Sequence, residues 1–67
     1  MTRDTNDLLK TLLNKLEDDA IKLIKQSGYT PRCVRRDDTD YFLTQDLNFS
    51  RINYTIRDNF IINTFIG

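Results

Sequence analysis

Histidine is absent from the 67-residue sequence, and cysteine occurs once, at Cys33. A single cysteine cannot close an internal disulfide, and without histidine the chain cannot form the mixed Cys/His sites that hold structural zinc. The thiol also has no histidine to activate it as a nucleophile, so we expect Cys33 to be a small, half-buried apolar residue. We therefore expect no catalytic residue, no metal site and no cofactor, and hence no enzyme.

An excess of either charge is also absent, because ten basic residues balance ten acidic ones. No net field draws such a chain to nucleic acid or to a membrane surface. The N-terminus has no apolar signal region, and the apolar runs are far too short to span a bilayer. We expect a reducing, cytoplasmic location, with neither nucleic acid nor membrane as a partner.

What the sequence does contain is a helical periodicity over residues 4–27, which predicts one continuous helix that ends at Gly28. Its apolar stripe consists of Leu9, Leu12, Leu13, Leu16, Ala20, Leu23 and Ile24. Such a helix would be about 33 Å long, more than a sheet of short strands can cover. The apolar residues near its start therefore either pack on the sheet or form the face of a homodimer, which would stabilise so small a domain. These residues are Leu8, Leu9, Leu12 and Leu13.

Alternating or apolar runs predict three strands, over residues 29–36, 51–57 and 60–66. Ile52, Tyr54 and Ile56 share one face of the second strand. An ordered crossover between the first two strands favours parallel pairing, and the turn residues after the second favour an antiparallel hairpin. The predicted fold is α+β, a single domain of residues 1–67 with one long N-terminal helix packed on a small mixed three-stranded sheet.

The first predicted strand carries a local cluster of positive charge, at Arg32, Arg35 and Arg36. On simple alternation Arg32, Val34 and Arg36 share one face. The cluster could bind phosphate, but three aspartates follow between residues 37 and 40 and nearly cancel its charge. We favour a solvated strand face over a nucleic-acid site.

Residues 37–50 form a connection that is long for so small a domain, and such connections are usually functional or disordered. Its apolar residues argue against disorder, and we expect Leu47 and Phe49 to anchor the loop. Asp46 and Arg51 could form an ion pair, either as an ordinary surface contact or as a brace. We favour a rigid loop that is presented to a partner.

The order of elements, together with residues 44–51, resembles the potato inhibitor I family of serine protease inhibitors and its small microbial relatives. The likeness covers about residues 20–67, and it is carried by Thr44-Gln45-Asp46, by Arg51 at the start of the next strand, by Ile52-Asn53, and by the final Phe65-Ile66-Gly67. The resemblance implies an extended, exposed binding loop of residues 37–50.

The resemblance implies a role for each loop residue. Gln45 would occupy the specificity position, and the Gln45–Asp46 peptide would be the scissile bond presented to the enzyme. Leu43, Thr44 and Leu47 would complete the target-binding loop, which Arg51 and Asn53 would support. The alternative is a non-inhibitory protein–protein interaction module, such as a phage or bacterial effector, that reuses the fold and dimerises through its helix.

Overall fold

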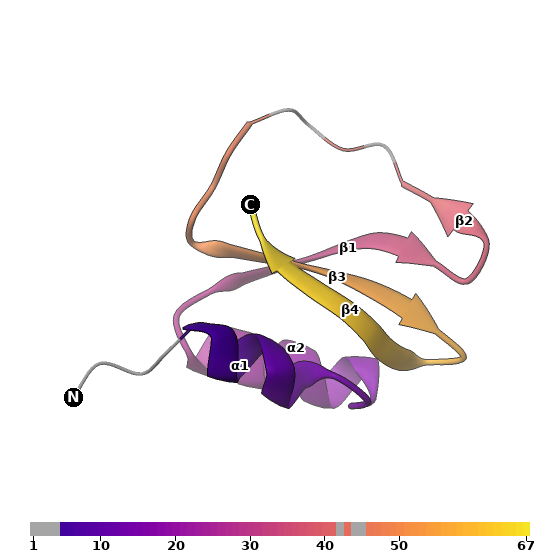
Figure 1. Ribbon diagram of the computed structural model, residues 1–67, viewed down its shortest axis with the longest axis horizontal. Coiled ribbons are helices and arrows are strands. Elements are labelled where there is room, and N and C mark those ends of the chain that lie inside the picture. Colours follow the sequence, from indigo (N-terminus) through magenta and orange to yellow (C-terminus); the bar gives the residue numbers. More distant parts are fainter. Residues whose placement is uncertain (1–4, 42, 44–45) are drawn as a thin grey trace.

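The computed structural model describes residues 5–41, 43 and 46–67. Its elements are α1 (Thr5–Leu12), α2 (Glu17–Gln26), β1 (Thr30–Arg36), β2 (Thr39–Asp40), β3 (Arg51–Arg57) and β4 (Phe60–Ile66). Both helices cover one face of a single sheet, and the described part of the β2–β3 connection lies on the opposite side (Figure 1). Neither described helix is long and apolar enough to cross a membrane.

The prediction of one helix over residues 4–27 is wrong, because the chain breaks after Leu12 and forms two helices of 8 and 10 residues. At the break, Asn14 adopts a left-handed φ of 67°. The Asn14 N–H donates to the Ile61 carbonyl (2.8 Å), and the Ile61 N–H donates to the Lys15 carbonyl (2.9 Å). The break thus replaces helical hydrogen bonds with bonds to the edge of β4. It also folds the second half of the apolar stripe back over the sheet.

The predicted three-stranded sheet is also wrong, because the sheet has four strands in the order β2-β1-β3-β4. The additional strand, β2, pairs antiparallel with the end of β1, inside the range predicted as loop. The strand pairing itself is confirmed: β1 and β3 run parallel, and β3 and β4 form an antiparallel hairpin. Asp58 and Asn59 close that hairpin with positive φ angles of 53° and 72°, as a tight two-residue turn requires. The fold class remains α+β.

The hydrophobic core lies between the two helices and the sheet. It consists of Leu8, Leu12, Ala20, Ile24, Ile52, Tyr54, Ile56 and Ile61. The three β3 residues predicted to share a face are therefore all buried. Of the four residues of the predicted dimer face, Leu8 and Leu12 are buried on the sheet at 5% and 0% exposure, Leu9 is partly buried, and Leu13 is 37% exposed, so Leu8 and Leu12 are not available to a second copy.

A bulge between Cys33 and Arg35 changes which face of the sheet the end of β1 presents. Beyond it Arg36 faces the helices, so the predicted common face of Arg32, Val34 and Arg36 is not formed. The Arg36 Nη1 donates to Glu17 Oε1 (2.9 Å), and the Tyr54 hydroxyl donates to Glu17 Oε2 (2.9 Å). Glu17 therefore ties the start of α2 to β1 and β3.

These contacts change the titration of the groups involved. The hydrogen bonds from the Arg36 guanidinium, above all, lower the pKa of Glu17 below its ordinary value, and the Tyr54 hydroxyl adds to the effect. Burial, followed by the bond to Glu17, raises the pKa of Tyr54. Both shifts favour the pair of a charged carboxylate and a neutral phenol that the structure contains.

Glu17→Gln is expected to lower the free energy of unfolding by about 1 kcal/mol near neutral pH, because the amide loses the charge-assisted bonds to Arg36. Asp18→Asn is the matched control, since Asp18 is an exposed carboxylate in the same helical turn. The pKa of Glu17 is lowered by folding, so its contribution is present above the ordinary glutamate pKa of about 4.3 and is lost as the pH falls below it. Urea unfolding at about pH 7 and about pH 3 measures the difference. A difference between wild type and Glu17→Gln that does not shrink at the lower pH would contradict this role.

Candidate functional site

The candidate site is the part of the β2–β3 connection that runs into β3. Of the residues assigned to the target-binding loop, Thr44 and Gln45 lie outside the described residues. Leu43, Asp46 and Leu47 are described, and all three side chains are exposed. The structure thus places Leu43, before the two undescribed residues, and Asp46 and Leu47, after them, at the surface.

Arg51, the first residue of β3, connects this loop to the end of the chain. Its Nε donates to the backbone oxygen of Gly67 (2.8 Å), and its Nη2 donates to the backbone carbonyl of Asp46 (3.2 Å). The Arg51 side chain is only 12% exposed. One largely covered guanidinium therefore joins two segments that are sixteen and five residues away from it in sequence.

The carboxylate of Asp46 contributes less than its backbone. Its Oδ2 lies 3.5 Å from Arg51 Nη1, and its side chain is 57% exposed. An ion pair at that distance and exposure is worth about 0 to 1 kcal/mol. The Arg51 guanidinium also donates to two backbone oxygens, those of Gly67 and Asp46. These bonds distinguish the contact from an ordinary surface ion pair.

Asn53 binds the same backbone oxygen of Gly67 that Arg51 binds. It is fully buried, and its Nδ2 donates to the Gly67 backbone oxygen (2.9 Å). Its Oδ1 accepts a bond from Arg32 Nε (2.6 Å). The chain Arg32–Asn53–Gly67–Arg51 therefore links β1, β3 and the residue after β4 beneath the loop.

The participation of Arg32 was missed in the sequence analysis, which placed this arginine on a solvated face. Arg32 is the direct partner of Asn53 across β1 and β3, a register that the sequence alone does not specify. Arg35 is also engaged locally, since its Nη1 donates to Asp40 (3.0 Å). Arg32, Arg35 and Arg36 each bond to different groups within the protein, so they do not converge on a common phosphate site.

The backbone between Asp46 and β3 is held by short-range bonds. The Arg51 N–H donates to the Asn48 carbonyl (3.1 Å), and the Ser50 N–H donates to Asn48 Oδ1 (2.8 Å). The Ser50 carbonyl in turn accepts from the Thr30 N–H of β1 (2.8 Å). The loop is thereby fixed to the sheet immediately before β3 begins.

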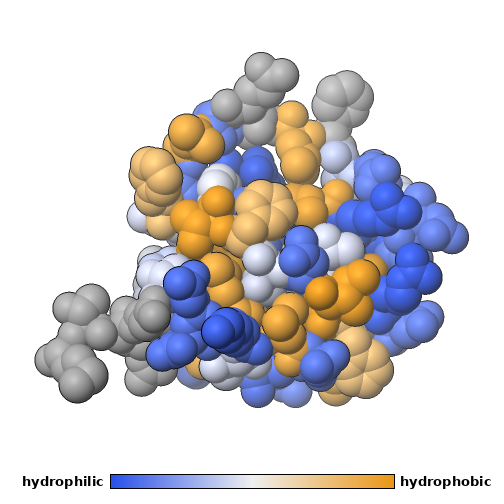
Figure 2. Space-filling view, viewed as in Figure 1, coloured by the Kyte–Doolittle hydropathy of each residue, from blue (hydrophilic) through white to orange (hydrophobic). Residues whose placement is uncertain are grey.

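Leu47 and Phe49 project from this fixed backbone into solvent, with 78% and 77% of their surface exposed. The expectation that they anchor the loop is therefore wrong. Apolar side chains gather along the loop where it descends to β3 (Figure 2). Two large apolar side chains held outward by a braced backbone are available to a partner.

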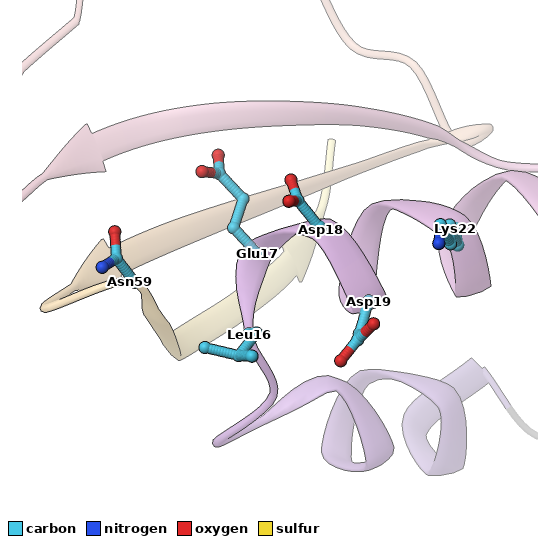
Figure 3. A pocket seen from close by; sticks show the side chains of 6 residues that line it. All are labelled: Leu16, Glu17, Asp18, Asp19, Lys22 and Asn59. Carbon is cyan, nitrogen blue, oxygen red and sulfur yellow. The ribbon is translucent and has the colours of Figure 1, made fainter.

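Neither Cys33 nor the hollow at the start of α2 has the features of a chemical site. The Cys33 thiol is half-buried and donates to the Arg35 carbonyl (3.4 Å), and burial raises its pKa, which lowers the thiolate fraction. A hollow of about 460 Å³ lies at the start of α2, lined by Leu16, Glu17, Asp18, Asp19, Lys22 and Asn59. Its side chains point in different directions and do not converge on one point (Figure 3). Among the described residues, no group of three candidate ligands could hold a metal ion.

Arg51→Lys is expected to loosen the loop without unfolding the domain, because an ammonium cannot reach both Gly67 and Asp46 as the guanidinium does. The loss should be about 1 to 2 kcal/mol of local stability, which increases amide exchange about tenfold at Ser50 and Arg51, whose N–H groups are hydrogen-bonded to Asn48. Arg57→Lys is the matched control, since Arg57 is exposed at the far end of the same strand. Hydrogen exchange followed by NMR measures the change. Equal exchange in the two variants would show that Arg51 does not brace the loop.

No family model matches the chain, and no curated protein or solved structure matches it significantly. What the loop can do is therefore inferred from its own contacts.

Proposed function

We propose that the chain acts as a serine protease inhibitor of the potato inhibitor I type, by presenting residues 43–47 to an enzyme cleft. The observation that supports this function is the Arg51 guanidinium, which holds the Asp46 carbonyl and the Gly67 oxygen at 3.2 and 2.8 Å. Asp46 directly follows Gln45 in the sequence, and the family resemblance assigns the Gln45–Asp46 peptide as the scissile bond.

A braced loop binds a cleft more tightly than a flexible one, because its ordering cost is met before binding. The guanidinium provides this order without a disulfide, which a chain with one cysteine cannot form. The brace acts on the C-terminal side of the proposed scissile bond. If the enzyme cuts that bond, Arg51 keeps the new amino end of Asp46 close to the acyl group, so resealing competes with release.

Gln45 defines the class of target. A neutral, polar side chain matches neither the aspartate-based pocket of a trypsin-like enzyme nor an apolar chymotrypsin-like slot. We therefore infer a protease whose specificity pocket accepts Gln or Glu.

A second function, that of a non-inhibitory interaction module, is favoured by the exposure of Leu47 and Phe49. Large apolar side chains in such positions are typical of contact residues at protein interfaces. In an inhibitor they would add contacts on one side of the scissile bond. In a module they would carry most of the binding, and Gln45 would contribute little.

A panel of serine proteases that includes enzymes accepting Gln or Glu separates the two functions. The inhibitor function predicts inhibition of at least one enzyme at about 1 μM protein, redirection of specificity by Gln45→Lys or Gln45→Leu, and loss of inhibition in the Asp46→Ala/Arg51→Ala variant. Lys25→Ala, which changes an exposed residue of α2 on the opposite side of the sheet from the loop (Figure 1), should leave inhibition unchanged.

No inhibition of any enzyme at about 10 μM would contradict the inhibitor function. A partner captured by the wild type and by Gln45→Ala, but lost with Leu47→Ser/Phe49→Ser, would then establish the module.

A further inference from the structure

The outer edge of β4 is protected along only half of its length. β4 is the last strand of the sheet, and its start is covered by the segment between the helices. There the Ile61 N–H and carbonyl bond to Lys15 and Asn14, and Leu16 forms a bridge with Phe60. No comparable cover continues along the described chain beside the second half of the strand.

The hydrogen-bond pattern shows which backbone groups of that second half point outward. The Gly67 N–H donates to the Arg51 carbonyl (3.2 Å), so Gly67 faces β3. Because successive residues of a strand point their N–H and carbonyl groups to alternate sides, those of Ile66 and Thr64 point away from β3. Within the part of the chain that the structure describes, no backbone group bonds to either residue from that side.

The second half of β4 has no charged residue and no proline to keep another strand away, although a bulge at Ile62 lies at its start. Natural edge strands are usually very short, or carry charged residues or proline. β2, at the opposite edge, is two residues long and includes Asp40. From residue 59 to residue 67, in contrast, the sequence has no charged residue and no proline. β4 is the strand nearest to the viewer, and apolar side chains gather on the same face of the molecule (Figures 1 and 2).

We propose that this edge pairs with the same edge of a second copy of the chain, in an antiparallel arrangement about a two-fold axis at Phe65. In that register Thr64 of each copy pairs with Ile66 of the other, which satisfies all four outward N–H groups of the two strands. Phe65, which is 42% exposed, meets Phe65 of the second copy directly. The proposal is independent of the function assigned to the loop.

A second copy fits this edge for three reasons. Residues 59–67 have no charged side chain, so two identical strands meet without repulsion between their side chains. A two-fold axis at Phe65 places the Cβ atoms of the two Phe65 residues about 5 Å apart. At that separation an aromatic pair across two strands stabilises a sheet. The inner face remains covered, because the Thr64 hydroxyl donates to the Leu9 carbonyl of α1 (3.0 Å), so pairing extends the sheet without rearranging the helix.

Analytical ultracentrifugation over a concentration series tests the proposal. The wild type should dimerise, and Phe65→Lys and Phe65→Glu should each weaken dimerisation at least about tenfold, because like charges then face each other across the axis. An equal mixture of the two variants should regain the dimer, since the charges become opposite. Thr39→Lys, which changes an exposed residue of β2 at the opposite edge of the sheet, should dimerise as the wild type does.

Amide exchange of the wild type gives a readout that needs no variant. The N–H groups of Thr64 and Ile66 should exchange more slowly as the protein concentration rises, whereas exposed amides of α2 should not change. A wild type that stays monomeric up to about 1 mM would overturn the proposal. So would a Phe65→Lys variant that dimerises as well as the wild type, or a mixture that forms no heterodimer.

Discussion

The Arg51 guanidinium is the contact on which the presentation of the loop depends. It lies at the start of the central strand β3, and it bonds to the loop on one side and to the end of β4 on the other. Its acceptor at Gly67 is fixed by the sheet, because Asn53 holds the Gly67 oxygen and the parallel pairing with β1 holds Asn53. The loop therefore takes its stability from the sheet, since none of its described residues belongs to the core.

The two faces of the sheet have different roles. On the inner face, the core residues and the Glu17 contacts to Arg36 and Tyr54 hold the helices in place. On the outer face, polar bonds between strands support a loop that exposes Leu47 and Phe49. A domain of this size has little stability in reserve, and it uses a buried asparagine and two arginines where larger domains use more apolar area.

The three longer strands could be predicted from local patterns, and the loop brace from the family resemblance. The alternation of Ile52, Tyr54 and Ile56 defines the buried face of β3, and Asp46 and Arg51 lie close in sequence. The break between the helices could not be predicted in this way, since the apolar stripe keeps its phase across Asn14. That break depends on bonds to Ile61, which is far away along the chain.

The remaining errors have the same origin in tertiary structure. A bulge in β1 moves Arg36 to the helix face, and no alternation pattern contains that information. β2 has only two residues and is defined by its pairing with β1 rather than by its own sequence. Leu47 and Phe49 are apolar, and composition alone assigns such residues to the interior. Their exposure follows from the backbone bonds that precede β3.

The most direct test of the braced loop is the backbone order of the free protein, measured by ¹⁵N relaxation in solution. If Arg51 holds the loop before any partner binds, the order parameters of Asp46, Leu47 and Asn48 should be close to those of β3, at about 0.85. Values below about 0.6 for these three residues, with a rigid β3, would contradict the account, because a loop that moves freely cannot be the preordered binding element proposed here.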